Sequence, residues 1–201
     1  YDTQVEVLFT DAADVMRRAA LAEIGRELRG HDQRNVRYLE AACGSGRFLS
    51  QTLDAFPRLN AEAFDLSPAY CDAARGAMRD WPHVQVGAAD IVATPYEDAA
   101  FDIAANIYLF HELPPPVRRQ AAAELARIIK PGGLLVFADS VQLDDAPAFS
   151  ASIERFPDLF HEPYYKSYLK TDLNALFAEV GFTPERETVS FLTKVIAFRR
   201  V

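Results

Sequence analysis

One segment of this chain constrains its fold more than any other. It reads as a strand that ends in an acidic residue and passes directly into a glycine turn and a helix. Residues 36–49 read VRYLEAACGSGRFL, with a mostly apolar run up to Glu40 and helical apolar spacing from Phe48 onward. Gly44 and Gly46 have no Cβ, so a ligand can lie against the backbone at the helix N-terminus. The segment predicts a ligand site at the carboxyl edge of a parallel sheet, although the glycines could serve only a tight connection.

A second strand that ends in an acid favours the ligand site. The run at 61–64 ends at Asp65, and Ser67 and Pro68 follow as a helix N-cap and first helical position. Asp65 lies about 20 residues beyond the glycine turn, the spacing at which a carboxylate reaches two ribose hydroxyls. The two signals together indicate a nucleoside-containing cofactor.

Four segments of the chain carry a resemblance to a known family. They are EAACGSGRF at 40–48, AFDLSP at 63–68, GAADIVATPYEDAAFD at 87–102 and LARIIKPGGLLVFADS at 125–140. In these segments the chain resembles the class I S-adenosylmethionine-dependent methyltransferases, especially the type 11 group that includes quinone-biosynthesis C-methyltransferases. The similarity extends more loosely to GFTPERETVSFLTKVIAFRR at 181–200, which looks like the closing antiparallel hairpin of that fold.

A nicotinamide dehydrogenase is the main competing interpretation of a glycine turn with a distant acid. Its fingerprint has three glycines, and the third allows close packing of the helix on the strand. Here Leu49 stands where that third glycine would fall, which disfavours a dehydrogenase. The resemblance also has a departure: Ala42 replaces the first glycine of the usual methyltransferase motif, so we expect a slightly altered turn that keeps the site.

The resemblance implies an α/β fold, a Rossmann-like three-layer sandwich with a seven-stranded, mostly parallel sheet and a C-terminal antiparallel hairpin. Alternating strand and helix patterns agree with right-handed βαβ crossovers. We expect strands at 61–65, 84–87, 101–107 and 134–138, and helices at 48–56, 68–78 and 116–129. Thr171 is expected to cap a later helix that ends at Val180. Residues 1–201 are predicted to form a single methyltransferase domain, with N-terminal helices about 1–30 and a substrate lid about 141–170.

Matching positions to the family assigns cofactor roles. Glu40 would face the methionine portion of the cofactor S-adenosyl-L-methionine, and Asp65 would accept hydrogen bonds from both ribose hydroxyls. Asp90 would meet the adenine amino group, or could instead cap a turn, while Ile91 would pack on the ring. The backbone of Asn106 would face the methionine amine. The predicted cofactor-binding set is Glu40, Ala42, Gly44, Gly46, Asp65, Leu66, Asp90, Ile91 and Asn106.

The acceptor side is predicted at the ends of the fourth and fifth strands. Tyr108 and His111 follow strand four, where the family places residues that face the transferred methyl group. His111 is the candidate catalytic residue, as a general base with a pKa near neutrality, or it could fix the loop as a hydrogen-bonded histidine. Asp139 ends strand five and could bind substrate or cap a helix.

An aromatic segment at 156–170, FPDLFHEPYYKSYLK, is the predicted core of the lid. Its phenylalanines are expected to pack on the sheet, whereas Tyr164 and Tyr165 each combine a ring with a hydroxyl and are better substrate contacts. His161 lies among them. The predicted substrate-binding set is Tyr108, His111, Asp139, His161, Tyr164 and Tyr165.

Composition limits the classes of partner. The net charge is −8 and the pI about 5.0, which disfavours nucleic acid. No apolar stretch approaches the roughly 20 residues of a membrane span. Two cysteines, Cys43 and Cys71, suggest free thiols in a reducing compartment, so a cytoplasmic location is expected. Metal-ligand spacing is absent, no metal is predicted, and the oligomeric state is left open.

The resemblance implies methyl transfer from S-adenosylmethionine to a small organic acceptor, at oxygen or carbon. Two alternatives use the same ligand. The protein could bind S-adenosylmethionine without methyl transfer, as a sensor or accessory subunit, or it could perform non-methylating cyclase or rearrangement chemistry. Fold and cofactor do not separate these alternatives, because the substrate site decides the reaction.

Overall fold

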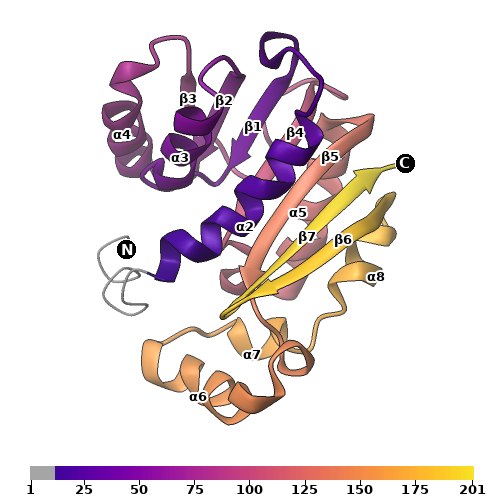
Figure 1. The fold of residues 1–201 in the computed structure, drawn as a ribbon. Helices are drawn as coiled ribbons and strands as arrows, with labels where there is room; N and C mark the ends of the chain where they lie inside the picture. The colour runs from indigo at the N-terminus through magenta and orange to yellow at the C-terminus, as the bar shows by residue number, and fades with distance from the viewer. Residues whose placement is uncertain (1–11) are drawn as a thin grey trace.

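The computed structural model describes residues 12–201 and contains one seven-stranded sheet with the order β3-β2-β1-β4-β5-β7-β6 (Figure 1). Strands β1 to β5 pair in parallel, and β7 runs antiparallel to both β5 and β6. The strands are β1 (Arg37–Ala41), β2 (Asn60–Asp65), β3 (Gln85–Ala88), β4 (Phe101–Ile107), β5 (Ile129–Ser140), β6 (Phe182–Ser190) and β7 (Thr193–Arg200). The predicted mostly parallel sheet with a C-terminal antiparallel hairpin is confirmed.

Helices cover both faces of the sheet and its carboxyl edge. The α-helices are α2 (Ala12–Glu27), α3 (Arg47–Ala55), α4 (Pro68–Ala77), α5 (Pro115–Ile128), α6 (Ser150–Phe160), α7 (Tyr165–Tyr168) and α8 (Leu173–Ala178). Short 3-10 helices include η3 (Phe110–Glu112), η4 (Leu143–Asp145) and η5 (Pro147–Phe149). Of the N-terminal helices predicted at about 1–30, α2 lies in the described part and residues 1–11 lie outside it. No helix among residues 12–201 combines the length and apolar character that a membrane span requires.

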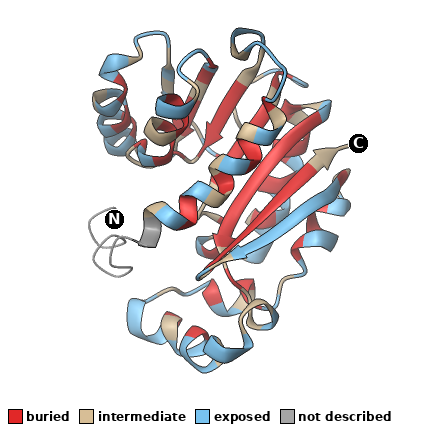
Figure 2. Cartoon of the chain, in the orientation of Figure 1, coloured by how far each residue is buried: buried red, intermediate tan, exposed pale blue. Residues whose placement is uncertain are grey.

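The two faces of the sheet carry separate apolar cores. Successive side chains of a strand point to opposite faces, so Tyr38 and Val136 pack with α2, α3 and α4, while Leu39 and Phe137 pack with α5, α7 and α8. Figure 2 shows β5 and β7 buried along most of their length, whereas β6 at the edge of the sheet is largely exposed. The result is the predicted three-layer sandwich.

Local sequence signals explain where α3 and α4 begin. Gly46 is the N-cap of α3 with a φ of 83°, a left-handed conformation that suits glycine. A Cβ at Gly46 would lie 3.2 Å from the Cβ of Ala74, so the glycine also allows α3 to approach α4 closely. Ser67 caps α4 by accepting the Tyr70 N–H at 3.4 Å, and Pro68 is the first helical residue, as predicted.

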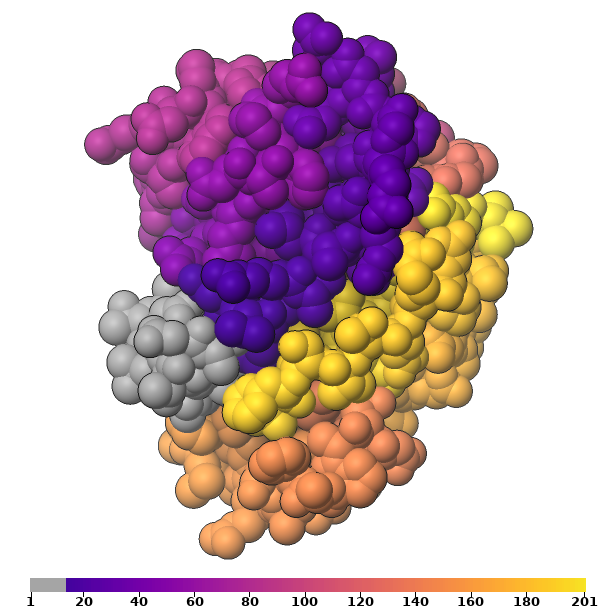
Figure 3. Space-filling view, viewed as in Figure 1, coloured from indigo at the N-terminus to yellow at the C-terminus, as the bar shows by residue number. Residues whose placement is uncertain are grey.

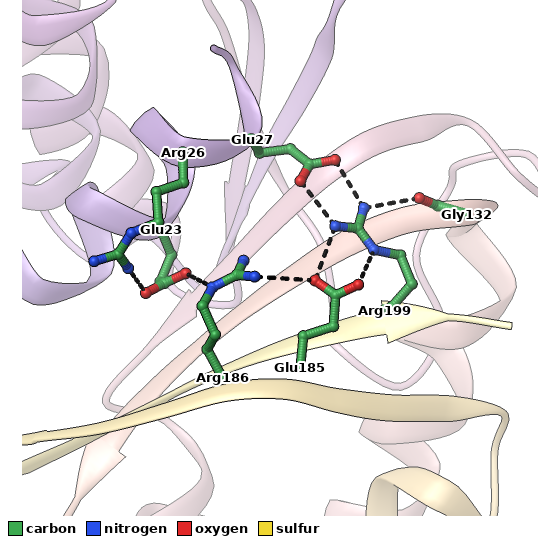
Figure 4. A network of polar contacts seen from close by, with 7 residues as sticks. All are labelled: Glu23, Arg26, Glu27, Gly132, Glu185, Arg186 and Arg199. Atoms are coloured by element: carbon green, nitrogen blue, oxygen red, sulfur yellow. Dashed lines mark hydrogen bonds and ion pairs between the residues drawn. The ribbon is translucent and has the colours of Figure 1, made fainter.

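A network of ion pairs fastens α2 to the C-terminal hairpin (Figure 4). Arg199 forms a bidentate pair with Glu27 at 2.7 and 2.8 Å and also contacts Glu185 at 2.9 Å. Arg186 reaches the buried carboxylate of Glu23 at 2.7 Å. These pairs hold α2 against the sheet and therefore fix the position of the residues that α2 brings to the site.

The segment 141–170 contains η4, η5, α6 and α7, follows β5, and forms the lower end of the molecule in Figure 3. Arg118 of α5 is almost completely buried and anchors the segment 141–170. The guanidinium donates to the carbonyls of Phe110 and Tyr164, both at 2.8 Å, and to the Thr171 hydroxyl at 3.0 Å. The predicted lid function of this segment stays a prediction.

The expected cap of the helix after this segment is wrong by one residue. The carboxylate of Asp172 accepts the Ala175 N–H at 2.9 Å and is the N-cap of α8, which ends at Ala178. Thr171 does not serve as the cap, because its hydroxyl donates to the Ser167 carbonyl and accepts from Arg118.

Candidate cofactor and acceptor site

A pocket of about 710 Å³ opens at the carboxyl edge of the sheet, where β1, β2 and β4 end. This volume falls within the range of small-molecule sites, and the position is the one favoured for ligands in open α/β sheets. The pocket brings together seven of the nine predicted cofactor residues: Glu40, Ala42, Gly44, Asp65, Leu66, Asp90 and Ile91.

The glycine turn after β1 leaves room for a ligand at the backbone. Gly44 has a φ of 55°, and a Cβ placed there would meet no protein atom within 4 Å. Ala42, at the position of the missing motif glycine, has a φ of 57°, so its methyl group is carried in a left-handed conformation. The turn therefore keeps the open backbone that a cofactor needs despite the alanine.

Asp65 joins the ends of β1 and β2. One carboxylate oxygen accepts the Gly44 N–H and the other accepts the Ser67 N–H, each at 2.9 Å. Each oxygen has a second acceptor position, so the side chain can still accept hydrogen bonds from a diol in the pocket. The donor and acceptor chemistry at this edge fits a nucleoside cofactor.

Glu40 lies at the floor of the pocket and is buried, with 2% of its surface exposed. The Tyr38 hydroxyl donates to its carboxylate at 3.4 Å. Burial raises the pKa of Glu40 to about 8, although hydrogen bonds and the charge of Arg17 act in the opposite direction. The folded chain therefore holds a protonated Glu40 at neutral pH unless a cation approaches it.

Two predicted cofactor residues lie outside the pocket lining. Gly46 packs against Ala74 of α4. Asn106 is fully buried and donates from Nδ2 to the Ala41 carbonyl at 3.0 Å, while its Oδ1 has no hydrogen-bond partner among residues 12–201. Their predicted cofactor roles stay predictions. Asp90 lines the pocket and also accepts the Val92 N–H at 3.1 Å, so it stabilises its own turn.

Among the predicted substrate residues, Tyr108 lines the pocket. It follows β4 with a φ of 55°, and its hydroxyl forms a hydrogen bond with the Thr193 hydroxyl of β7. Burial raises the pKa of Tyr108 to about 12, so the phenol is neutral. The ring is thus fixed between the cofactor pocket and the hairpin.

His111 and Asp139 form a buried pair next to the pocket. His111 Nδ1 lies 2.6 Å from Asp139 Oδ1, and the backbone N–H of His111 donates to Asp139 Oδ2 at 3.3 Å. Burial lowers the pKa of His111, but the charge and hydrogen bond of Asp139, together with nearby carboxylates, outweigh burial and the net shift is upward. Neither residue lines the pocket, whereas the neighbouring Glu112 does.

The predicted contacts of the aromatic segment lie outside the pocket lining. Tyr165 is buried, its hydroxyl bonds to the Ser140 hydroxyl, and its ring centre lies 5.7 Å from that of His111. Tyr164 is partly exposed and offers its carbonyl to Arg118. His161 is the exposed C-cap of α6. Their predicted roles in substrate binding stay predictions.

Several lining residues were missed by sequence reasoning. Arg17 from α2 and Glu112 from η3 are charged side chains in the pocket, and Leu113 and Val117 add apolar surface. Arg17 lies far from the motif in the sequence and reaches the pocket because α2 packs across the sheet (Figure 1). The sequence could have indicated Glu112, because it directly follows the predicted site residue His111 in the segment after β4.

The chain has the sheet order, the glycine turn and the strand-ending acids of the class I S-adenosylmethionine-dependent methyltransferases, and the comparisons with known proteins support that class. Residues 39–133 match the family described as a methyltransferase domain.

Similar proteins agree with this assignment. The chain is 28% identical over 176 residues to the O-methyltransferase cnsE of Penicillium expansum, covering 86% of the chain and 60% of that protein. It is 31% identical over 141 residues to the malonyl-[acyl-carrier protein] O-methyltransferase of Paenibacillus sp. (strain JDR-2), covering 68% of the chain and 49% of that protein. The chain thus spans about half to three fifths of these curated relatives.

The fold is shared with solved methyltransferase structures. The geranyl diphosphate C-methyltransferase of Streptomyces coelicolor, in complex with Mg²⁺, geranyl diphosphate and S-adenosyl-L-homocysteine, aligns with a TM-score of 0.69. The alignment covers 92% of this chain and 79% of that chain at 17% sequence identity. At this identity the similarity shows a shared fold and no more.

Proposed function

We propose that this protein binds S-adenosylmethionine in the pocket at the carboxyl edge and catalyses methyl transfer to the oxygen or carbon of a small organic acceptor. The observation that carries the proposal is the Gly44 backbone, open to the pocket and hydrogen-bonded to the strand-ending carboxylate of Asp65. The match of residues 39–133 to the methyltransferase domain family supports it, and so does the fold that the chain shares with a solved methyltransferase structure.

Each end of the cofactor has matching groups in this proposal. Asp65 accepts hydrogen bonds from the ribose hydroxyls, while Asp90 and Ile91 receive the adenine at the rim of the pocket. Glu40 lies beneath the methionine portion, where a positively charged ammonium would favour ionisation of its carboxyl group. When bound, the cofactor supplies an electrophilic methyl group on a sulfonium ion.

The acceptor lies at the opposite end, beside Tyr108 and Glu112. Leu109, Leu113 and Val117 also line the pocket, and such an apolar wall favours a small acceptor with an apolar body. The tasks of the protein there are to align the acceptor nucleophile with the methyl group and to exclude water. The 28% identical relative is an O-methyltransferase and the aligned structure is a C-methyltransferase, so the proposal leaves both acceptor atoms open.

Two measurements test the proposal. Isothermal titration should detect binding of S-adenosylmethionine and S-adenosylhomocysteine, and no comparable binding of NAD. Incubation with methyl-labelled donor and pooled small-molecule acceptors, followed by mass spectrometry, should reveal label transfer. Preferential binding of NAD would overturn the proposed cofactor. Cofactor binding without label transfer in broad acceptor pools would favour a sensor or accessory subunit.

A further inference from the structure

The imidazole of His111 binds Asp139 through Nδ1, and its other nitrogen, Nε2, points away from Asp139. Asp139 is completely buried and occupies Nδ1 at 2.6 Å, which leaves Nε2 facing Glu112. The distance from Nε2 to Glu112 Oε1 is 3.8 Å, too long for a hydrogen bond, and within residues 12–201 Nε2 has no other polar partner. The side chain is 8% exposed, so an unpartnered nitrogen of a buried ring points at a carboxylate.

A second carboxylate approaches the same point from another part of the chain. Glu162 lies between α6 and α7, in the segment 141–170, and its carboxylate, that of Glu112 and the His111 ring each offer one atom within 4.8 Å of the others. Neither Glu112 nor Glu162 forms an ion pair with a lysine or an arginine of residues 12–201. Two carboxylates and an imidazole nitrogen therefore converge, and no lysine or arginine of the described residues pairs with either carboxylate.

The distances suit a metal ion. Metal–ligand bonds of about 2.0–2.2 Å keep two donors of one ion within about 4.4 Å of each other. The separation of 3.8 Å between His111 and Glu112 already satisfies this limit, and the widest separation, no more than 4.8 Å, needs a rotamer shift of about 0.4 Å. The bond from Asp139 to Nδ1 is the arrangement that orients histidine ligands in metal sites.

We propose that His111 Nε2 and the carboxylates of Glu112 and Glu162 bind a first-row divalent metal ion at the acceptor end of the pocket. One imidazole with two carboxylates favours a transition-metal ion such as Mn²⁺ or Zn²⁺ over an ion that prefers oxygen donors alone. Three protein ligands leave open positions for water or for an anionic oxygen of the acceptor. The site also links the segment 141–170 to η3 through Glu162.

The class of acceptor follows from the position of the site. Glu112 lines the pocket, so an oxygen bound to the metal would lie at the edge of the cofactor chamber. An acceptor with a carboxylate, enolate or phosphate oxygen matches the open positions of the ion. This last step rests on the proposed function, whereas metal binding itself does not. The sequence predicted no metal because the ligands come from separate parts of the chain.

Manganese binding tests the site without any substrate. Free Mn²⁺ has a strong electron paramagnetic resonance signal, and addition of the protein should remove the signal of one ion per chain. Glu112→Gln and Glu162→Gln should each weaken Mn²⁺ binding at least tenfold, and Asp139→Asn should weaken it about 10- to 100-fold by releasing the histidine. Glu154→Gln, on the exposed surface of the same segment, is the matched control and should bind as the wild type does.

Wild-type protein that binds no Mn²⁺, or that binds several weakly and equally in the Glu112→Gln and Glu162→Gln variants, would overturn the site. Glu162 is only partly buried, so its variant remains informative if the Asp139 variant fails to fold. Titration of S-adenosylhomocysteine on the same samples separates the two proposals. If this ligand binds and Mn²⁺ does not, the metal site fails alone; if neither cofactor form binds, the proposed function fails independently.

Discussion

The backbone N–H of Gly44 donates to the carboxylate of Asp65 at 2.9 Å, so the turn after β1 and the end of β2 form one unit. The two residues are brought together by the parallel pairing of β1 with β2, in which Ala41 lies opposite Phe64. A change at either residue is therefore expected to affect the same cofactor contact.

Asp65→Ala should weaken S-adenosylmethionine binding by about 2 to 3 kcal/mol, roughly 30- to 150-fold, because charged hydrogen bonds to two hydroxyls are lost. Isothermal titration measures the change. Asp80→Ala, at an exposed aspartate in the 3-10 turn that follows α4, is the control and should leave the affinity unaltered. An unchanged affinity in a folded Asp65→Ala protein would show that Asp65 is not the ribose ligand.

Gly44→Ala and Gly46→Ala should show which glycine leaves room for the cofactor and which one allows α3 to pack closely on α4. Both residues have positive φ, so each alanine costs about 1–2 kcal/mol of backbone strain. The new methyl at position 46 would also press on Ala74 at 3.2 Å, so this variant should lose more stability. The methyl at position 44 meets no protein atom and should mainly weaken cofactor binding.

Urea denaturation and cofactor titration of both glycine variants measure these two effects. Wild-type cofactor affinity in Gly44→Ala would mean that the cofactor does not approach the backbone at this turn. Equal losses of stability in the two variants would mean that contact with Ala74 adds little to the conformational strain.

Cofactor binding should release a proton from Glu40. The pKa of this buried carboxyl is raised to about 8, so the free protein is mostly protonated there at pH 7. A cationic ligand lowers that pKa, and binding should therefore tighten as the pH rises from roughly 5 to 8. Titration calorimetry in two buffers of different ionisation enthalpy counts the released protons.

Glu40→Gln should abolish this proton release, whereas Glu97→Gln on the surface should preserve it. The same shift has a consequence for stability. The folded state holds the proton of Glu40 more tightly than the unfolded state does. The contribution of Glu40 to the free energy of unfolding is therefore fully present below its ordinary pKa and is lost as the pH rises toward 8. A wild-type enthalpy of binding that is independent of buffer would contradict a cation next to Glu40.

Arg118→Met should loosen the segment 141–170. The variant removes the three hydrogen bonds that the Arg118 guanidinium donates, and a loss of about 2–4 kcal/mol in unfolding free energy is expected. Hydrogen exchange of residues 161–171 should become faster than in the wild type. Arg119→Met, at the exposed neighbouring position, is the control, and equal exchange in both variants would remove Arg118 as the anchor.

Local signals in the sequence determined much of the fold. The strand at 101–107 and the start of α4 at Ser67-Pro68 were predicted at their observed positions, because apolar spacing and caps act over a few residues. The glycine turn and the acid at position 65 indicated the site for the same reason. Both lie at strand ends, and parallel strands present those ends along one edge.

Tertiary structure decided what local signals do not encode. β5 was predicted at 134–138 but extends over Ile129–Ser140, since pairing with β4 and β7 supplies partners for its flanking backbone. The Thr171 hydroxyl accepts a hydrogen bond from Arg118, and Asp172 is the N-cap of α8 in its place.

The acceptor end shows the same division between sequence and tertiary structure. The sequence marked His111 and Asp139 separately, yet only the packing of η3 against the end of β5 makes them a pair. Arg17 of α2 lines the pocket, and Glu162 of the segment 141–170 approaches His111 and Glu112; no spacing in the sequence predicts either position. Contacts between distant segments depend on how helices pack on the sheet, and that packing is a property of the whole fold.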